Sequence, residues 1–328
     1  MRLMLKLLEY GHKGYRRIHH SFTMSVSQQI NENNAKQIIE TVDNFLFDCD
    51  GVLWDGSGPI EGSLETIKKL KSLGKKVYYV TNNSSKCRDD YVAKCKEYGF
   101  PAETEEIVCT AYIAAQYLKT IGYQGKVYLI GKEESLGYEL KKAGIKYFGT
   151  GPDPLKGTSY QEWLTEIQLD PEVKCVVVGF DPHINYMKMM RAASYLTNPE
   201  CLYVATNEDG SLPVKEKNIC IPGTGCMVLP VTVAANRNPT LMGKPETNMF
   251  DVLQKVHNLD PSKCMMTGDR INTDIMFAKK CGIRSLLVLS GISTEDELIT
   301  PSGKGSMADD QKQPDFYAPC LADLGKFI

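Results

Sequence analysis

The chain has 328 residues, of which 42% are hydrophobic and 24% charged, as expected for a soluble globular protein long enough for two domains. Its 38 basic and 40 acidic residues give a net charge of -2, which excludes a broad basic surface for nucleic acid. No apolar run is long enough to cross a bilayer, and eleven scattered cysteines without a Cys-x-x-Cys pair indicate reduced thiols in a cytosolic compartment.

Residues 1–35 are predicted to be an N-terminal extension outside the folded core. The first 30 residues contain five basic residues and a single acid, Glu9. Lys6 interrupts any apolar core of a secretory signal, so secretion is not expected. Two interpretations stay open: a disordered extension of a cytoplasmic protein, or a mitochondrial presequence.

The first strand of the predicted core carries two carboxylates at its end. The apolar run 45–47 predicts a buried strand, and Asp48 and Asp50 follow it before Gly51. Side chains two residues apart point the same way, so both acids should face the crevice at the carboxyl end of a doubly wound sheet. The thiol of Cys49 should then point into the core. Two neighbouring carboxylates resist joint ionisation unless a cation compensates them, so a metal ion or a lysine is expected beside them.

The next strand of the core ends in polar side chains. A helix is predicted at 63–73, a strand at 76–80 and a further helix at 86–98. Thr81, Asn82 and Asn83 lie between the last two elements. Hydroxyl and amide groups at a strand end before a helix can bind an oxyanion, and the position beside the acidic strand favours this role over an ordinary turn.

A second α/β unit is predicted at residues 124–238, inserted into the core formed by 36–123 and 239–328. Strands are expected at 126–130, 175–180 and 201–205, with helices at 134–143 and 183–196. The core sheet is expected to resume at 240–242, just before Lys244. A strand at 263–267 should then deliver Asp269, with Asp274 at the start of a helix at 273–281. Residues 302–313 are predicted to form a surface loop.

Four motifs in this order resemble those of the haloacid dehalogenase-like phosphatases: DCDG at 48–51, TNN at 81–83, GKP at 243–245 and GDRINTD at 268–274. The segments 177–196, 206–213 and 222–226 resemble the branch of phosphoglycolate phosphatase and 4-nitrophenylphosphatase, close to pyridoxal phosphatase. The resemblance implies a doubly wound, Rossmann-like parallel sheet with an inserted α/β cap domain of the C2 type, and a homodimer formed through the cap.

The resemblance also implies a role for each motif residue. Asp48 would be the nucleophile that forms an aspartyl-phosphate, and Asp50 the general acid and base. Mg²⁺ would be held by Asp48, the main-chain carbonyl of Asp50 and Asp269, with Asp274 orienting these groups from behind. Phosphate oxygens would be bound by Thr81, Asn82, Asn83 and Lys244.

The substrate is expected to be a small phosphorylated metabolite. Cap loops at 179–183 and 207–213 should face the site. His183 lies in the first of these loops, but a histidine at such a position more often caps a helix or packs against its neighbours than contacts substrate. Relatives that act on pyridoxal phosphate place a histidine where this chain has Leu212, which favours 2-phosphoglycolate, with 4-nitrophenyl phosphate accepted in vitro. Pyridoxal phosphate or phosphoprotein substrates are the alternatives. Asp50 and Asp269 argue against a dehalogenase, a phosphomutase remains a minor alternative, and the intact motifs disfavour a scaffold without activity.

Overall fold

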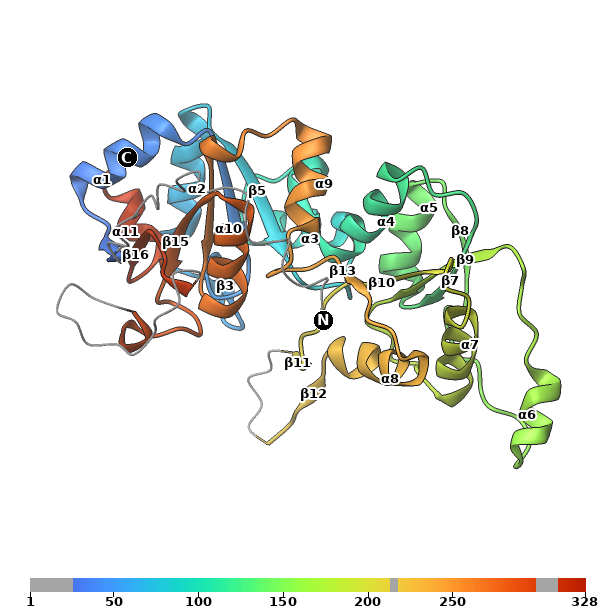
Figure 1. Cartoon of the computed structure of the whole chain (residues 1–328). Helices are drawn as coiled ribbons and strands as arrows, with labels where there is room; N and C mark the ends of the chain where they lie inside the picture. The colour runs from blue at the N-terminus through green and yellow to red at the C-terminus, as the bar shows by residue number, and fades with distance from the viewer. Residues whose placement is uncertain (1–25, 213–217, 299–311) are drawn as a thin grey trace, which may run out of the picture.

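The computed structural model describes residues 26–212, 218–298 and 312–328, drawn in colour in Figure 1. Residues 1–25 of the predicted extension and most of the predicted loop at 302–313 lie outside these ranges. The described chain forms two α/β units, each built around its own parallel sheet. Within the described residues, no helix combines the length and apolar character needed to span a membrane.

The larger unit contains a seven-stranded sheet in which every neighbouring pair is parallel. From β2 (Asn44–Asp48) the chain first adds β5 (Lys76–Thr81) and β6 (Ile107–Cys109) on one side. It later adds β14 (Cys264–Gly268), β15 (Arg284–Val288) and β16 (Phe316–Ala318) on the other side. The order therefore reverses between β2 and β14, and this confirms the predicted doubly wound sheet. The strands, in spatial order, are β1 (Gln28–Gln29), β16 (Phe316–Ala318), β15 (Arg284–Val288), β14 (Cys264–Gly268), β2 (Asn44–Asp48), β5 (Lys76–Thr81) and β6 (Ile107–Cys109).

Helices cover this sheet, which explains why its central strands are apolar on both faces. Phe45, Leu46 and Phe47 of β2 are all fully buried. A short antiparallel hairpin, β3 (Trp54–Asp55) with β4 (Gly58–Pro59), follows the end of β2. The helices of this unit are α1 (Glu32–Thr41), α2 (Ser63–Ser72), α3 (Arg88–Glu97), α4 (Thr110–Thr120), α9 (Asn248–His257), α10 (Met276–Cys281) and α11 (Leu321–Gly325).

The core begins earlier in the chain than residue 36. Strand β1 pairs with β16 at the edge of the large sheet, and Asn31 caps α1 by accepting hydrogen bonds from the N–H groups of Asn33 and Asn34. Residues 28–35 are thus part of the fold, and the prediction of an extension reaching residue 35 is wrong for them. The missed signal is the capping asparagine, which starts a helix at residue 32.

The smaller unit contains a five-stranded parallel sheet and lies beside the core, on the right in Figure 1. Its strands, in spatial order, are β13 (Thr240–Leu241), β10 (Leu202–Ala205), β9 (Val173–Val178), β7 (Lys126–Ile130) and β8 (Lys146–Phe148). Its helices are α5 (Tyr138–Lys142), α6 (Tyr160–Glu166), α7 (Tyr186–Leu196) and α8 (Gly225–Ala235), and a hairpin joins β11 (Ser211–Leu212) to β12 (Ile221–Pro222).

Strand β13 corrects one expectation. The segment at 240–242 was expected to resume the core sheet, but β13 pairs with β10 at the edge of the cap sheet. The N–H of Met242 also bonds to the carbonyl of Ala205 at 2.9 Å. The cap sheet therefore extends past residue 238, and the chain passes directly from its edge strand into the loop that carries Lys244. The hydrophobic pattern of the sequence cannot show which of two parallel sheets so short a strand joins.

Candidate active site

The two units meet over a cavity of about 100 Å³ at the carboxyl ends of β2 and β5. The cavity lies next to the position in the core sheet where the strand order reverses, which is the usual ligand site in doubly wound folds. Core side chains form one wall and cap side chains the other. The lining consists of Asp48, Asp50, Thr81, Asn82, Asn83, Ser84, Ser85, Phe180, Asn207, Asp209, Ser211, Leu212, Thr224, Lys244, Arg270, Thr273 and Asp274.

Lys244 is clamped between two carboxylates. Its Nζ lies 2.6 Å from Asp48 Oδ1 and 2.7 Å from Asp274 Oδ1, and its side chain is only 2% exposed. Burial opposes its charge, but the carboxylates of Asp274 and Asp48 outweigh burial and raise the pKa of Lys244. The lysine therefore remains charged at any physiological pH.

The main chain of Lys244 is held by Asn82. Lys244 N–H donates to Asn82 Oδ1 at 2.8 Å, and Asn82 Nδ2 donates back to the Lys244 carbonyl at 2.9 Å. A side chain at Gly243 would approach Asn82 Oδ1 to 2.8 Å, so only glycine allows this close approach. Asn82, predicted to bind substrate, uses its amide to position the lysine loop.

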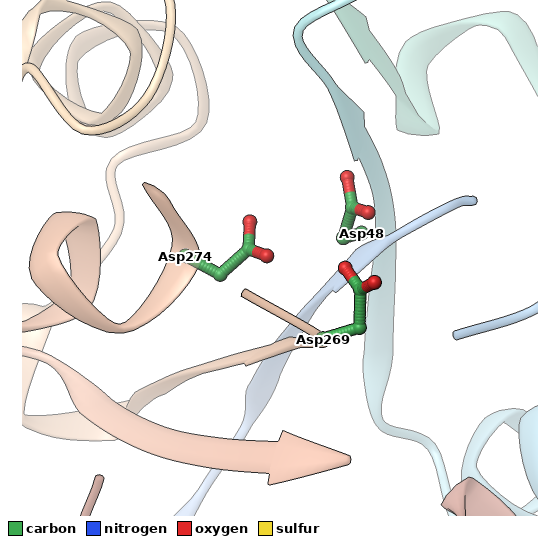
Figure 2. Close-up of side chains that lie close together, drawn as sticks. All are labelled: Asp48, Asp269 and Asp274. Atoms are coloured by element: carbon green, nitrogen blue, oxygen red, sulfur yellow. The ribbon is translucent and has the colours of Figure 1, made fainter. Parts of the chain in front are cut away.

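Three acids, Asp48, Asp269 and Asp274, lie close together, as Figure 2 shows. Carboxylate oxygens of the three all lie within 4.8 Å of one another. Burial raises the pKa of Asp48 well above its usual value, and Lys244 opposes this rise only in part. Burial, reinforced by Asp274, raises the pKa of Asp269 to about 6. Three acids against one lysine leave uncompensated negative charge, which favours a bound cation.

Asp269 has the geometry of a metal ligand. Its Oδ2 accepts a hydrogen bond from Ile292 N–H at 2.8 Å, whereas its buried Oδ1 has no partner among the described residues. A side chain at Gly51 or at Gly291 would clash with its carboxylate at 2.5 Å or less, so both glycines make room for it. The donors are all oxygen, so the residues present fit a hard divalent cation held by Asp48 and Asp269.

Asp274 serves the cluster differently. Besides its ion pair with Lys244, its Oδ2 accepts the N–H of Arg270 at 3.1 Å. Its Oδ1 is held by the ion pair with Lys244 and has no hydrogen bond of good geometry among the described residues. The orienting role assigned to Asp274 stays a prediction.

Asp50 lies at the mouth of the cavity, with a side chain that is 47% exposed. Its Oδ1 accepts a hydrogen bond from the indole Nε1 of Trp54 at 3.0 Å and lies 3.8 Å from Lys94 Nζ. Asp48 and Asp50 therefore both line the cavity as the strand alternation predicted. Cys49 between them is fully buried, which confirms its assignment to the core.

The loop after β5 presents hydroxyl and amide groups to the same cavity. Thr81 Oγ1 accepts the N–H of Asn83 at 3.2 Å, and Asn83 Oδ1 accepts both the N–H and the hydroxyl of Ser85 at 2.7 Å. Thr81 and Asn83 line the cavity, as do Ser84 and Ser85, which the sequence analysis assigned no role. These short local bonds fix the loop so that its remaining donors can face an oxyanion.

The cap closes the other side. Leu212 lines the cavity as predicted, together with Phe180 and Asp209. Asn207 Nδ2 donates to the Asn82 carbonyl at 2.7 Å and so joins cap to core. His183 is exposed and does not line the cavity.

Arg270 and Thr273 are cavity residues that the sequence analysis did not single out. Both stand inside GDRINTD, between acids that were assigned roles. The available signal was their position at a strand end, which places consecutive loop residues over the same crevice.

Two family models match the chain. One, described as haloacid dehalogenase-like hydrolase, covers residues 45–146, and another of the HAD hydrolase-like type covers 241–324. The first match covers the core before the cap and extends into the cap, and the second covers the core after the cap.

Curated relatives match over nearly the whole chain. The glycerol-3-phosphate phosphatase of Rattus norvegicus is 39% identical over 304 residues, covering 90% of this chain and 94% of its own. The 4-nitrophenylphosphatase of Schizosaccharomyces pombe is 39% identical, covering 89% and 96%. Phosphoglycolate phosphatase 2 of Arabidopsis thaliana is 37% identical, covering 92% and 98%.

Solved structures share the arrangement. A p-nitrophenyl phosphatase from Archaeoglobus fulgidus matches with a TM-score of 0.71 and 27% identity over 88% of this chain and 99% of that one. A glycerol phosphate phosphatase from Mycobacterium tuberculosis, crystallised in complex with magnesium, matches with a TM-score of 0.70 and 26% identity over 88% and 77%. With the acids, the lysine and the inserted cap in place, the chain belongs to the haloacid dehalogenase-like hydrolases and is one of their phosphoric monoester hydrolases.

Proposed function

We propose that this enzyme is a Mg²⁺-dependent phosphatase of small phosphomonoesters that works through an aspartyl-phosphate on Asp48. The observation that carries the proposal is the buried contact between Lys244 Nζ and Asp48 Oδ1, beside two further acids at the floor of the cavity. A carboxylate held by a permanent cation at the closed end of a small cavity is placed to meet a phosphorus atom rather than bulk water.

In the first step, an Asp48 oxygen attacks phosphorus and the bond from phosphorus to the leaving oxygen breaks. Asp50 gives its proton to that oxygen, so the leaving group departs as an alcohol. In the second step, a water oxygen attacks phosphorus, Asp50 takes back a proton, and the bond to Asp48 breaks to release inorganic phosphate. Trp54 aims Asp50 from the mouth of the cavity, where a leaving group would lie.

The phosphate would lie between Lys244 and the loop of Thr81 and Asn83. Lys244 neutralises charge on both Asp48 and the phosphate oxygens. Mg²⁺ would be held by Asp48, Asp269 and the main-chain carbonyl of Asp50, with Asp274 fixing Lys244 behind them. When bound, the ion would neutralise phosphate charge and align it with the nucleophile.

The proposed substrate is 2-phosphoglycolate, with glycerol 3-phosphate as the second candidate. The cavity of about 100 Å³ suits a two- or three-carbon ester better than pyridoxal phosphate or a phosphoprotein. Relatives named for each small substrate match about equally well. Arg270 favours 2-phosphoglycolate, because an arginine could pair with the carboxylate of this substrate. Arg270 lines the cavity, and among the described residues its guanidinium has no carboxylate within 4 Å.

We also propose a homodimer formed through the cap. Helices α7 and α8 contact each other and expose large apolar side chains to solvent: Tyr186, Leu229 and Val233 are 55%, 62% and 70% exposed. Such a patch is typical of a protein interface. Val233→Glu should yield a monomer by light scattering, whereas a wild-type protein that is already monomeric would refute the dimer.

The decisive test of the activity is a kcat/KM panel on purified protein. 2-Phosphoglycolate, glycerol 3-phosphate, pyridoxal phosphate and 4-nitrophenyl phosphate would be compared with and without Mg²⁺, with Asp48→Asn as the control for contaminating phosphatases. Preference for 2-phosphoglycolate supports the proposal. Preference for glycerol 3-phosphate would replace the substrate, and no Mg²⁺-dependent turnover on any ester would refute the mechanism.

A further inference from the structure

A buried ion pair in the cap is not used by the chemistry described above. Lys188 of α7 is 0% exposed and Asp181 of the preceding loop 1% exposed, and Lys188 Nζ donates to Asp181 Oδ2 at 2.6 Å. Removing two charges from water is costly, and a well-packed apolar pair is often no less stable. A fully buried pair therefore calls for a reason other than stability.

Asp181 uses its other groups to hold its own loop. Its Oδ1 accepts the N–H of His183 at 2.8 Å, and its N–H points to the sulfur of Met227 in α8 at 3.0 Å. The loop is thus fixed to α7 through Lys188 and to α8 through Met227. The loop at 179–183 was expected to face the site, and Asp181 instead turns inward as its anchor.

The residue before Asp181 is the one that reaches the site. Phe180 lines the catalytic cavity, and its N–H donates to Ser84 Oγ at 3.2 Å. Ser84 belongs to the core loop that follows Thr81, and its hydroxyl also lies 3.4 Å from Thr224 Oγ1 of the cap. Two adjacent residues therefore have different roles. Asp181 anchors the loop in the cap, and Phe180 lines the cavity while its side chain packs against the apolar cluster of the cap.

Resting on the proposed function, we infer that Lys188 and Asp181 are positioning residues that fix Phe180 over the leaving group of the substrate. The phosphate is bound by the core, at Lys244 and the loop of Thr81, so the pair acts on the part of the substrate that the cap covers. An interaction of this kind is similar in the ground state and the transition state, so its loss raises KM and leaves kcat nearly unchanged.

The test is the double variant Asp181→Asn with Lys188→Met, which removes both charges together. Either single substitution would leave a buried unpaired charge and destabilise the cap. In the double variant, the introduced asparagine can still accept the N–H of His183 while the clamp to α7 is lost. The KM for the phosphomonoester that the wild type prefers should rise about fivefold, which is the effect expected from the loss of one aromatic contact. The kcat should stay within about twofold of the wild-type value.

Two measurements separate positioning from general damage. The inhibition constant of inorganic phosphate should not change, because phosphate lacks the leaving group that the cap covers. The matched control is Lys126→Met, which breaks a cap ion pair of the same 2.6 Å length, to Asp170, away from the cavity lining. This control should retain the wild-type KM.

A second variant addresses the connecting step. Phe180→Ala keeps the ion pair and should reproduce the rise in KM even if the double variant folds poorly. Unchanged KM in the folded double variant or in Phe180→Ala would overturn the inference, as would an equal weakening of inorganic phosphate. A wild-type enzyme without phosphatase activity would instead refute the proposed function, so the two failures are distinguishable.

Discussion

The ammonium group of Lys244 lies 2.6 Å from Asp48 Oδ1, with the lysine side chain almost fully buried. The contact joins the end of a central core strand to the loop that returns from the cap. Because the two residues are 196 positions apart in the chain, Asp48 gains this charged partner only in the folded protein.

Asp48→Asn should abolish turnover while the protein stays folded. The substitution is nearly isosteric, and Lys244 keeps its ion pair with Asp274 at 2.7 Å. We expect kcat to fall by more than about a hundredfold, the loss typical of a removed nucleophile. Steady-state kinetics and a thermal melt test this, and a variant that keeps more than about a hundredth of the wild-type rate would contradict the assignment.

Asp50→Asn should harm substrates unequally. A proton donor matters most for a poor leaving group, so turnover of alkyl phosphates should fall much further than turnover of 4-nitrophenyl phosphate. Trp54→Phe, which removes the hydrogen bond of 3.0 Å to Asp50, should show a weaker form of the same pattern. Equal losses on aryl and alkyl esters in Asp50→Asn would rule out a general acid at this position.

Activity should require Mg²⁺, and Ca²⁺ should inhibit. Ca²⁺ takes more oxygen ligands at longer distances, so it could bind Asp48 through both oxygens and disturb the in-line attack. Assays after exhaustive chelation, followed by stepwise addition of each ion, measure this. Full activity of the chelated enzyme would remove the metal from the mechanism.

Asp269→Asn should stabilise the metal-free protein at pH 8. The folded-state pKa of Asp269 is raised to about 6 from an ordinary 3.8, so the folded protein binds the extra proton between these values. Ionisation of Asp269 therefore lowers the free energy of unfolding as pH rises from about 4 to about 6, by roughly 3 kcal/mol at most. The asparagine can still accept the hydrogen bond from Ile292.

Melting temperatures in a chelator at pH 8 and pH 4 test this, with the gain expected only at pH 8. Added Mg²⁺ should raise the melting temperature of the wild type and not that of the variant. A variant less stable than the wild type at pH 8 would mean that Asp269 is not held as an uncompensated charge.

Leu212→His should raise kcat/KM for pyridoxal phosphate relative to 2-phosphoglycolate. Leu212 lines the cavity, and an aromatic leaving group would gain a flat partner there that a two-carbon acid cannot use. The change should be on the order of 1 kcal/mol. Both substrates should be measured on both proteins, and an unchanged ratio would show that residue 212 does not contact the leaving group.

The fold class and the acids of the site could be predicted from the sequence alone. Apolar strands ending in polar motifs can be read locally, because strand alternation and the position of strand ends fix which side chains reach the crevice. Asp48, Asp50, Thr81 and Asn83 line the cavity for this reason, whereas Lys244 reaches it from a loop that follows a strand of the cap sheet. The order of the four motifs then identified the family.

The contacts between these residues could not be predicted from the sequence and became visible in the three-dimensional structure. The Asn82 side chain contacts the lysine loop because Gly243 leaves room for its amide oxygen, and β13 pairs in the cap because β10 offers it a free edge. Asp181 and Lys188 are seven residues apart, but their burial depends on α7 and α8 packing together. Such contacts depend on the joint placement of distant segments, which local periodicity does not encode.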